Sequence, residues 1–232
     1  MAMLLIPYLC GGTIAPLILY DLIASYSAPL DLMSPFNFDH DYVLETNCVR
    51  LIPLSLDHYA QLLPYALQQP DIWHYSLVSA AGSEGMQQYI TTALAARQAQ
   101  REYPFVVFDK QTEQYAGSTR YYDMVLDQQT LEIGYTWYAA AFRGTGLNKH
   151  CKWLLLSFAF EQLGIERVGF RADANNARSI AAMKSIGCTP EGILRHDRLK
   201  SDGGRRSSIV LSILRDEWFG GIKQQLHEKI GV

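Results

Sequence analysis

The chain has 232 residues, of which 49% are hydrophobic and 19% are charged, a composition typical of a folded globular protein. Its formal net charge of −3 argues against a general nucleic-acid-binding protein, because neutralising phosphates requires a basic face. The sequence contains neither HExxH nor GxSxG, so metalloprotease and α/β-hydrolase chemistry have no motif support.

The first forty residues differ in composition from the rest. Residues 1–20 carry no charge and have about the length of a membrane span, but prolines and glycines interrupt them and no Lys or Arg flanks them. Three interpretations remain open: an apolar extension that packs on the domain or on a partner, a weak membrane anchor, or an artefactual start upstream of Met33. We treat residues 1–40 as an extension of uncertain status and residues 41–232 as one domain, and we expect a cytoplasmic protein.

The cysteines form no CxxC pair and have no histidine at metal-ligand spacing beside them. They are Cys10, Cys48, Cys151 and Cys188. Cysteines in this arrangement are typically small buried hydrophobic residues in a reducing compartment, so we expect no metal site.

The first half of the domain predicts a strand, two helices and a β-hairpin. Val43–Pro53 mixes β-branched and polar residues as a strand does, and a helix begins near Ser55. A second amphipathic helix fits Ser83–Arg101. Two strands, Tyr103–Phe108 and Tyr115–Met124, then flank a polar turn.

The segment Leu131–Tyr138 alternates apolar and other residues, as a strand with one buried face does. The residues expected on the buried face are Leu131, Ile133, Tyr135 and Trp137. The opposite face carries Glu132 and Gly134, and a glycine inside a strand often marks a close approach by a ligand or another backbone.

The second half predicts two more helices, a strand, a hairpin and a closing helix. These elements are Leu147–Leu163 (helix), Arg167–Arg171 (strand), Asn176–Ile186 (helix), Gly192–Leu199 with Ser207–Leu214 (hairpin), and Asp216–Ile230 (helix). Gly164 and Gly187 stand where each of the first two helices should end. Strands and helices without repeats or linkers indicate a single α/β domain.

A glycine-rich segment, residues 143–146, joins the strand that ends at Tyr138 to the next helix. Glycines let several backbone N–H groups converge on one anion, and the helix adds its own unpaired N–H groups and the positive end of its dipole. The neutral alternative is a tight turn that only starts a helix. A Walker P-loop needs Lys-Ser or Lys-Thr after its last glycine, where this chain has Leu147-Asn148. A dinucleotide fingerprint needs a third glycine, where this chain has Lys149. Both motifs are therefore excluded.

The segment Arg143–Asn148 resembles the acyl-CoA pyrophosphate loop of the GNAT superfamily, whose pattern is Gln/Arg-x-x-Gly-x-Gly/Ala. Further matches follow in the expected order: Leu155–Leu163, Arg167-Val168, Asp173–Ser179, Ile186-Gly187, Glu191-Gly192, Leu194–His196 and Glu217-Trp218. The set is similar to the RimJ/RimL-type branch, which includes Nα-acetyltransferases of ribosomal proteins. The resemblance covers about residues 43–228.

This resemblance implies an α+β fold: a single GNAT-like domain with a mixed, mostly antiparallel sheet flanked by helices and strands splayed apart at the acyl-CoA site. It implies transfer of an acetyl group from acetyl-CoA to a primary amine, carried either by a protein N-terminus or by a small molecule. The alternative is a non-catalytic acyl-CoA-binding module. Many relatives pair as dimers, so a homodimer is open.

Four positions depart from the family pattern. Ala141 stands where the loop has Gln or Arg, with Arg143 as a substitute two residues later. His150 and Ser207 occupy positions where relatives often carry Glu and Asp. Met183 stands where several GNAT enzymes place a tyrosine that protonates the leaving thiolate, so that proton must come from elsewhere or not at all.

Amine acylation by a thioester needs a neutral amine, donors for the oxyanion and a proton for the thiolate. Glu132 is the candidate base, directly or through a water; the alternative is a structural carboxylate paired with a neighbouring strand. A free backbone N–H near Trp137 or Tyr138 is the candidate oxyanion donor. In the RimJ/RimL-type relatives, the pair matched here by Asn176 and Ser179 faces the cofactor, with the asparagine on the pantetheine arm and the serine near the sulfur. Asn176 is also a plain helix N-cap.

The remaining candidates bind the cofactor or the acceptor. The expected cofactor contacts are Phe142, Arg143, Gly144, Thr145, Gly146, Leu147, Asn148 and Asn176. Lys152 is either a further cofactor contact or a solvated helix residue. The candidate acceptor-pocket residues are Trp73, Tyr121, Tyr122 and His196, with Arg195 at the rim. The alternative for each of them is simple packing.

Overall fold

The computed structural model describes residues 36–200 and 203–231, so the interpretations of residues 1–35 lie outside the described residues. Within this part of the chain, no helix is both long and apolar enough to cross a membrane. No group of three or more His, Cys, Asp or Glu in the same residues could hold a metal ion. Cys151 and Cys188 are buried, Cys48 is half-buried, and all three are free thiols.

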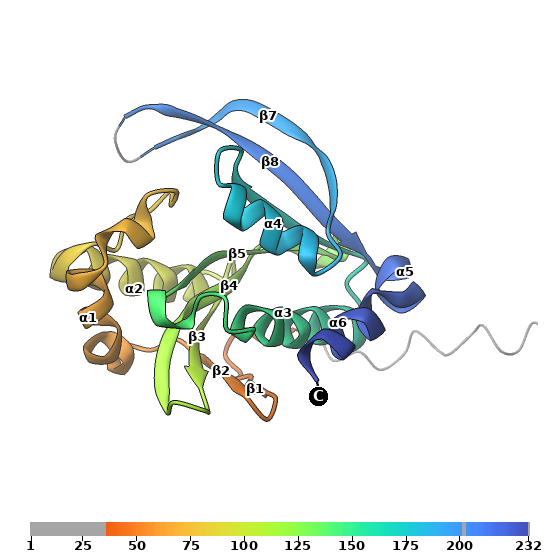
Figure 1. Ribbon diagram of the computed structural model, residues 1–232, viewed down its shortest axis with the longest axis horizontal. Helices are drawn as coiled ribbons and strands as arrows, with labels where there is room; N and C mark the ends of the chain where they lie inside the picture. The colour runs from red at the N-terminus through yellow and green to blue at the C-terminus, as the bar shows by residue number, and fades with distance from the viewer. Residues whose placement is uncertain (1–35, 201–202, 232) are drawn as a thin grey trace, which may run out of the picture. The chain divides into compact units, whose positions relative to one another are not determined.

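An eight-stranded mixed sheet forms the centre of the domain (Figure 1). Its strands are β1 (Leu44–Glu45), β2 (Val49–Pro53), β3 (Tyr103–Asp109), β4 (Gln114–Val125), β5 (Thr130–Tyr138), β6 (Arg167–Asp173), β7 (Thr189–Leu199) and β8 (Arg205–Leu214). The spatial order is β1-β2-β3-β4-β5-β6-β8-β7. Every neighbouring pair is antiparallel except β5 and β6, which run parallel. The predicted mixed, mostly antiparallel sheet is confirmed.

Helices cover both faces of this sheet. They are α1 (Tyr59–Gln68), α2 (Gly82–Gln98), α3 (Leu147–Ser157), α4 (Ala177–Ser185), α5 (Arg215–Glu217) and α6 (Lys223–Ile230). Helices α1 and α2 pack with one apolar cluster of the sheet, and α3 and α6 pack with the other. In Figure 1 the long β7–β8 hairpin arches over α4.

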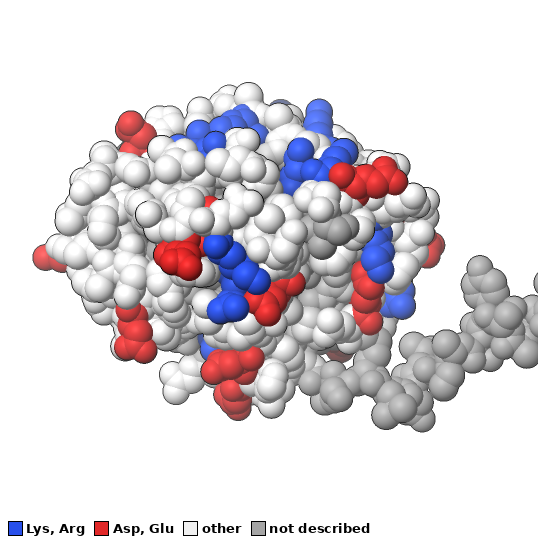
Figure 2. Space-filling model, turned by 60° about the horizontal axis from the view of Figure 1, so that its bottom comes forward, with Lys and Arg blue, Asp and Glu red and all other residues white. Residues whose placement is uncertain are grey.

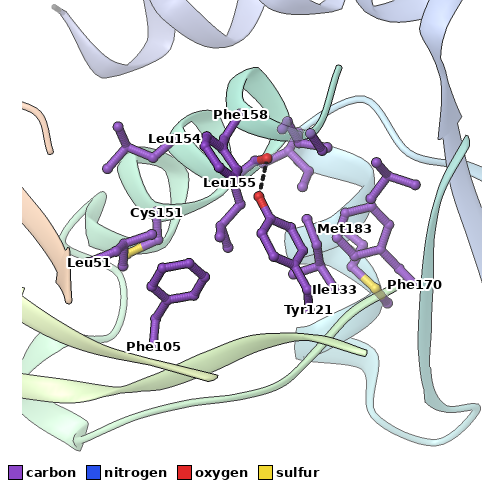
Figure 3. Packing of buried hydrophobic residues seen from close by; sticks show 14 of the residues in the cluster. Leu51, Phe105, Tyr121, Ile133, Cys151, Leu154, Leu155, Phe158, Phe170 and Met183 are labelled. Carbon is purple, nitrogen blue, oxygen red and sulfur yellow. Dashed lines mark hydrogen bonds between the residues drawn. The ribbon is translucent and has the colours of Figure 1, made fainter. Parts of the chain in front are cut away.

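The larger apolar cluster lies between the sheet and α3, α4 and α6. In Figure 3, Phe105 and Tyr121 point from the sheet toward α3, and Phe170 packs beside Met183 of α4. The Tyr121 hydroxyl donates a hydrogen bond of 2.6 Å to the Leu155 carbonyl. Tyr121 is fully buried; it is a core residue and not part of an acceptor pocket, contrary to the prediction.

Strand β5 contains a β-bulge that the alternating pattern did not predict. Its register against β4 shifts by one residue between the Gly134–Arg120 and Trp137–Ser118 pairs, and Tyr135 has a φ of 49°. Because an extra residue turns all later side chains to the other face, Trp137 packs with α1 and α2, whereas Leu131, Ile133 and Tyr138 join the larger cluster. The prediction that Trp137 shares a face with Leu131 was therefore wrong.

Strands β5 and β6 separate after a short paired stretch. Their parallel register covers only Thr130, Leu131 and Glu132 of β5, although β5 continues to Tyr138 and β6 to Asp173. Beyond this point β6 pairs only with β8 on its other side. The splayed strands are thus present, and they open a gap in the middle of the sheet.

Smaller differences concern element ends. The predicted first strand is broken into β1 and β2, and the long helix that begins at Leu147 ends in a π-helical turn over Phe158–Gln162. Gly164 and Gly187 have φ values of 63° and 100°, which L-residues rarely adopt, so the predicted glycine ends of the helices are confirmed.

Charged side chains of both signs lie interspersed on the face drawn in Figure 2. Blue Lys and Arg groups stand directly beside red Asp and Glu groups, with uncharged surface between them. This face therefore offers no continuous basic area of the kind that a nucleic-acid backbone requires.

Candidate functional site

A cavity of about 420 Å³ lies at the gap between β5 and β6, within the size range of small-molecule sites. Residues of β4, β5, β6, α3, α4 and the β7–β8 hairpin line it, together with the loop after β5 and the segment between α1 and α2. Most of the predicted site residues converge on this one space.

The glycine loop forms part of the cavity wall, and its shape depends on unusual backbone angles. Gly144 and Gly146 have φ values of 78° and 93°, and Gly146 caps the start of α3. The Thr145 hydroxyl donates 2.9 Å to the Phe142 carbonyl and so closes the turn. Phe142, Arg143, Gly144 and Asn148 line the cavity, whereas the Leu147 side chain is buried in the core. Thr145 and Gly146 shape the loop without lining the cavity.

Two arginines face the same part of this cavity. Arg143 follows the loop's first turn and donates from Nε to the Tyr138 carbonyl at 2.9 Å, and Arg178 lies in the first turn of α4. Both line the cavity. Partial burial lowers the pKa of Arg143, and repulsion from Arg178 lowers it further. Two like charges held together in a cavity create a site for a multiply charged anion. Sequence reasoning missed Arg178, although its position two residues after Asn176 could have indicated it.

Asn176 caps helix α4, as predicted. Its side-chain Oδ1 accepts a hydrogen bond of 3.1 Å from the Ser179 backbone N–H. Asn176 and Ser179 both line the cavity, as does Met183 one helical turn after Ser179. The cap fixes the start of α4, and so it fixes where Ser179 presents its side chain.

Glu132 is held in a polar cluster that joins three strands. One carboxylate oxygen accepts from Arg171 Nε of β6 at 2.9 Å, and the other accepts from the Tyr122 hydroxyl of β4. The carboxylate is 14% exposed and does not line the cavity, whereas Tyr122 and Arg171 do. Direct contact between Glu132 and an amine does not fit this arrangement, whereas a base that acts through an intervening group and a carboxylate paired with neighbouring strands both fit it.

Gly134 has no side chain, and this leaves room for the ring of Tyr122. A Cβ atom at Gly134 would lie 2.5 Å from Cε1 of Tyr122, so the Tyr122 ring packs on this glycine. The close approach suggested by the sequence is real, but an aromatic ring makes it. Gly134 therefore helps to hold the Tyr122 hydroxyl toward Glu132.

Lys152 is buried, with 4% of its surface exposed, and is not a solvated helix residue. Its ammonium group donates to the hydroxyls of Thr136 (2.9 Å) and Thr119 (3.3 Å), and these hydroxyls lie 2.7 Å apart. Burial lowers the Lys152 pKa from 10.5 to about 8. Lys152 lines the cavity, and no carboxylate of the described residues forms an ion pair with it.

The end of β5 presents backbone groups to the gap. The Ala139 N–H donates to the Ala116 carbonyl of β4, so strand alternation turns the Tyr138 N–H and C=O to the opposite edge. The Arg143 side chain reaches the Tyr138 carbonyl on that edge. A donor for an oxyanion at Tyr138 is consistent with this geometry, whereas the Trp137 N–H is turned toward β4, where Trp137 pairs with Ser118.

The predicted acceptor residues divide into two groups. Trp73 and Tyr122 line the cavity. Tyr121 lies in the core, and His196 is exposed on β7 outside the cavity lining. The hairpin instead contributes Arg198 and Arg206, which the sequence analysis did not single out. The hairpin contains a register shift between Leu194 and Arg198, and a shift of this kind changes which residues face inward.

Comparisons with known proteins identify relatives of this chain. YdaF of Bacillus subtilis (strain 168), provisionally named a ribosomal N-acetyltransferase, is 37% identical over 97 residues, which are 41% of this chain and 52% of YdaF. The matched region thus spans about half the length of that curated relative.

Solved structures share the fold over most of the chain. A crystal structure of a provisionally named acetyltransferase from T. thermophilus is 29% identical, with a TM-score of 0.75 over 85% of this chain and all of that chain. Mycobacterium smegmatis RimJ in complex with CoA-disulfide has a TM-score of 0.68 at 18% identity, over 81% of this chain and 93% of that chain. This second likeness concerns the fold alone.

The family match covers strands β2 to β6, the glycine loop and α4. Residues 49–189, more than half of the chain, match the acetyltransferase (GNAT) domain. This region contains most of the cavity wall, including the separated strands β5 and β6. The chain belongs to the GNAT acetyltransferase domain family.

Proposed function

We propose that this protein transfers an acetyl group from acetyl-CoA to a primary amine. The observation that carries the proposal is the cavity at the separation of β5 and β6, where the glycine loop, Arg143 and Arg178 meet. Two arginines that form no ion pair within the described residues, beside a helix start, suit a diphosphate. The gap next to them suits an extended arm, because no described strand pairs with the edge of β5 there.

Cofactor binding would use the loop and α3. Backbone N–H groups between Phe142 and Asn148 lie at the positive end of the α3 dipole, and Arg143 and Arg178 add direct charge. Asn176 stands at the start of α4 across the cavity, where its amide is available to an extended arm.

Activation of the amine would use Tyr122 and Glu132 together. Tyr122 lines the cavity, and its hydroxyl donates to Glu132. Burial and then the Glu132 charge raise the Tyr122 pKa. The phenol therefore stays protonated. It relays a proton: as the amine attacks, its proton passes to the Tyr122 oxygen and the phenol proton passes to Glu132. The Tyr138 N–H would receive the oxyanion.

The acceptor is either a protein N-terminus or a small-molecule amine. The name of YdaF points to ribosomal proteins for that relative, and a ribosomal protein N-terminus is one candidate acceptor in the cytoplasm. Arg198 and Arg206 of the hairpin line the same cavity as Asp123 and Glu102, so the acceptor would meet charges of both signs.

The test measures CoA release from acetyl-CoA by the purified full chain. The acceptors are peptides with free N-termini, a polyamine and free amino acids, and mass spectrometry identifies the acetylated product. We expect acceptor-dependent CoA release, and loss of CoA binding in an Arg143→Ala/Arg178→Ala double variant. If the wild-type chain binds CoA but transfers no acetyl group to any acceptor, the non-catalytic acyl-CoA-binding module is supported. If the wild-type chain does not bind CoA, the proposed site is refuted.

The relay is tested separately with two conservative variants. Glu132→Gln and Tyr122→Phe should each lower turnover by about 10²-fold, the usual contribution of acid–base catalysis, with little change in CoA affinity. Unchanged turnover in both variants would exclude this route for the amine proton.

A further inference from the structure

The wall of the cavity contains a charged group that the proposed function does not use. The Lys152 ammonium is buried on α3, is hydrogen-bonded to two threonine hydroxyls and has no anionic partner among the described residues. Burial of an unpaired charge costs several kcal/mol. Groups held at such a cost in a cavity are candidates for function rather than for stability.

The hydrogen bonds of Lys152 leave one proton directed elsewhere. An ammonium group has three N–H donors, and Thr136 and Thr119 accept two of them. The two hydroxyls are also bonded to each other at 2.7 Å, which fixes the ammonium relative to β5. The third N–H is available to a ligand in the cavity that Lys152 lines.

The position of Lys152 is close to where the acyl group must react. Thr136, its nearer partner, lies on β5 two residues before Tyr138, whose backbone faces the gap. An electrostatic interaction with Cys188 indicates that the ammonium also lies near the segment that follows α4. Ser179 and Met183 line the same cavity from α4.

We propose that Lys152 is the general acid that protonates the departing CoA thiolate; this inference rests on the proposed acetyl transfer. When the tetrahedral intermediate collapses, the C–S bond breaks, its electron pair goes to sulfur, and a proton moves from Nζ to give CoA thiol. The neutral Lys152 amine is then reprotonated from solvent, and Glu132 releases to solvent the proton that it received from the attacking amine through Tyr122. The acid thus comes from α3, because Met183 of α4, which stands at the position of the family tyrosine, cannot donate a proton.

The surroundings of Lys152 favour this group over other donors. Its pKa of about 8 lies near the working pH, where acid catalysis is most effective. The titratable groups that interact with it are the Cys151 and Cys188 thiols, whose pKa burial raises to about 12. The Tyr138 phenol interacts in turn with Cys151, and burial raises its pKa as well. These groups stay neutral over the relevant pH range, so the titration of Lys152 dominates locally.

The test compares Lys152→Met and Lys152→Arg with the wild-type full chain. Single-turnover rates of CoA release are measured from pH 6 to pH 10, and CoA affinity is measured by calorimetry. Met has no charge and no proton, whereas Arg keeps the charge but does not release a proton in this range. Lys149→Met, three residues earlier on α3, is the matched control.

We expect both Lys152 variants to lose about 10²-fold in the single-turnover rate while CoA affinity changes by less than about threefold. The wild-type rate should fall above pH 8 as Lys152 loses its proton, and this alkaline fall should disappear in Lys152→Met. A rate within about threefold of wild type, an unchanged alkaline fall, or full rescue by Arg would overturn the inference. None of these outcomes would affect the proposed function, which fails only if the wild-type chain itself transfers no acetyl group.

Discussion

Replacing Lys152 by methionine should stabilise the folded protein at neutral pH. The folded-state pKa of about 8, against 10.5 for a free lysine, corresponds to about 3 kcal/mol of destabilisation while the group is charged. Methionine fills a similar volume without a charge. The Thr119 and Thr136 hydroxyls remain bonded to each other, so neither is left without a partner.

The sign of the pH dependence follows from the lowered pKa. Below about pH 8 lysine is protonated in both the folded and the unfolded chain, and the folded state carries the full cost of burial. Between pH 8 and 10.5 the folded state releases its proton first, so the wild-type protein gains stability as pH rises. Lys152→Met should therefore raise the free energy of unfolding by about 1–3 kcal/mol at pH 7, and this gain should shrink toward pH 10. The gain is smaller than the full cost of the buried charge because the substitution also loses some packing.

Urea unfolding of the full chain without CoA measures this difference at pH 7 and pH 9.5. Lys149→Met serves as the control, because Lys149 is only half-buried and should change the free energy of unfolding by less than about 0.5 kcal/mol. The reasoning fails if Lys152→Met destabilises the protein at pH 7, or if its effect is the same at both pH values.

Three further substitutions test the core, the Tyr122 support and the loop. Tyr121→Phe should cost about 1 kcal/mol of unfolding free energy in urea titration, since it removes the hydrogen bond to the Leu155 carbonyl. A changed KM for the acceptor would contradict the assignment of Tyr121 to the core. Gly134→Ala should move the Tyr122 ring by about 1 Å, because the new Cβ would lie 2.5 Å from Cε1 of Tyr122, whereas an ordinary contact is about 3.5–4.0 Å. Turnover should fall at least tenfold. Wild-type turnover would contradict the role of this glycine. Gly146→Glu should weaken CoA binding by more than tenfold in calorimetry, because it adds a negative charge to the loop at a residue with φ of 93°. Circular dichroism should show that the fold is retained. Unchanged affinity would show that the loop does not bind CoA.

In the proposed site, Arg143 and Arg178 would allow a protein with a net negative charge to bind a diphosphate. The net charge of −3 describes the whole chain, but the two guanidinium groups come together from a loop and a helix that are separated in sequence. Burial and then repulsion from Arg178 lower the pKa of Arg143, and this repulsion raises the energy of the empty site. Binding of a diphosphate would relieve this repulsion, and this relief would contribute to the free energy of binding.

The sequence by itself determined the order of elements, the loop and the helix ends. Glycine at Gly144, Gly146, Gly164 and Gly187 marks positions with positive φ, a local property that does not depend on distant contacts. Asn176 likewise marks a helix start through its own side chain. Local rules were sufficient for these features because their causes lie within a few residues along the chain.

Only the tertiary structure decided which side chains meet. The bulge in β5 sends Trp137 to one face and Tyr138 to the other, because one extra residue against β4 reverses the alternation. Burial of Tyr121 and Lys152 depends on how α3 packs on the sheet, and the engagement of Glu132 depends on residues of two other strands. Such outcomes follow from contacts between segments far apart in sequence, and a periodic pattern within one segment carries no information about them.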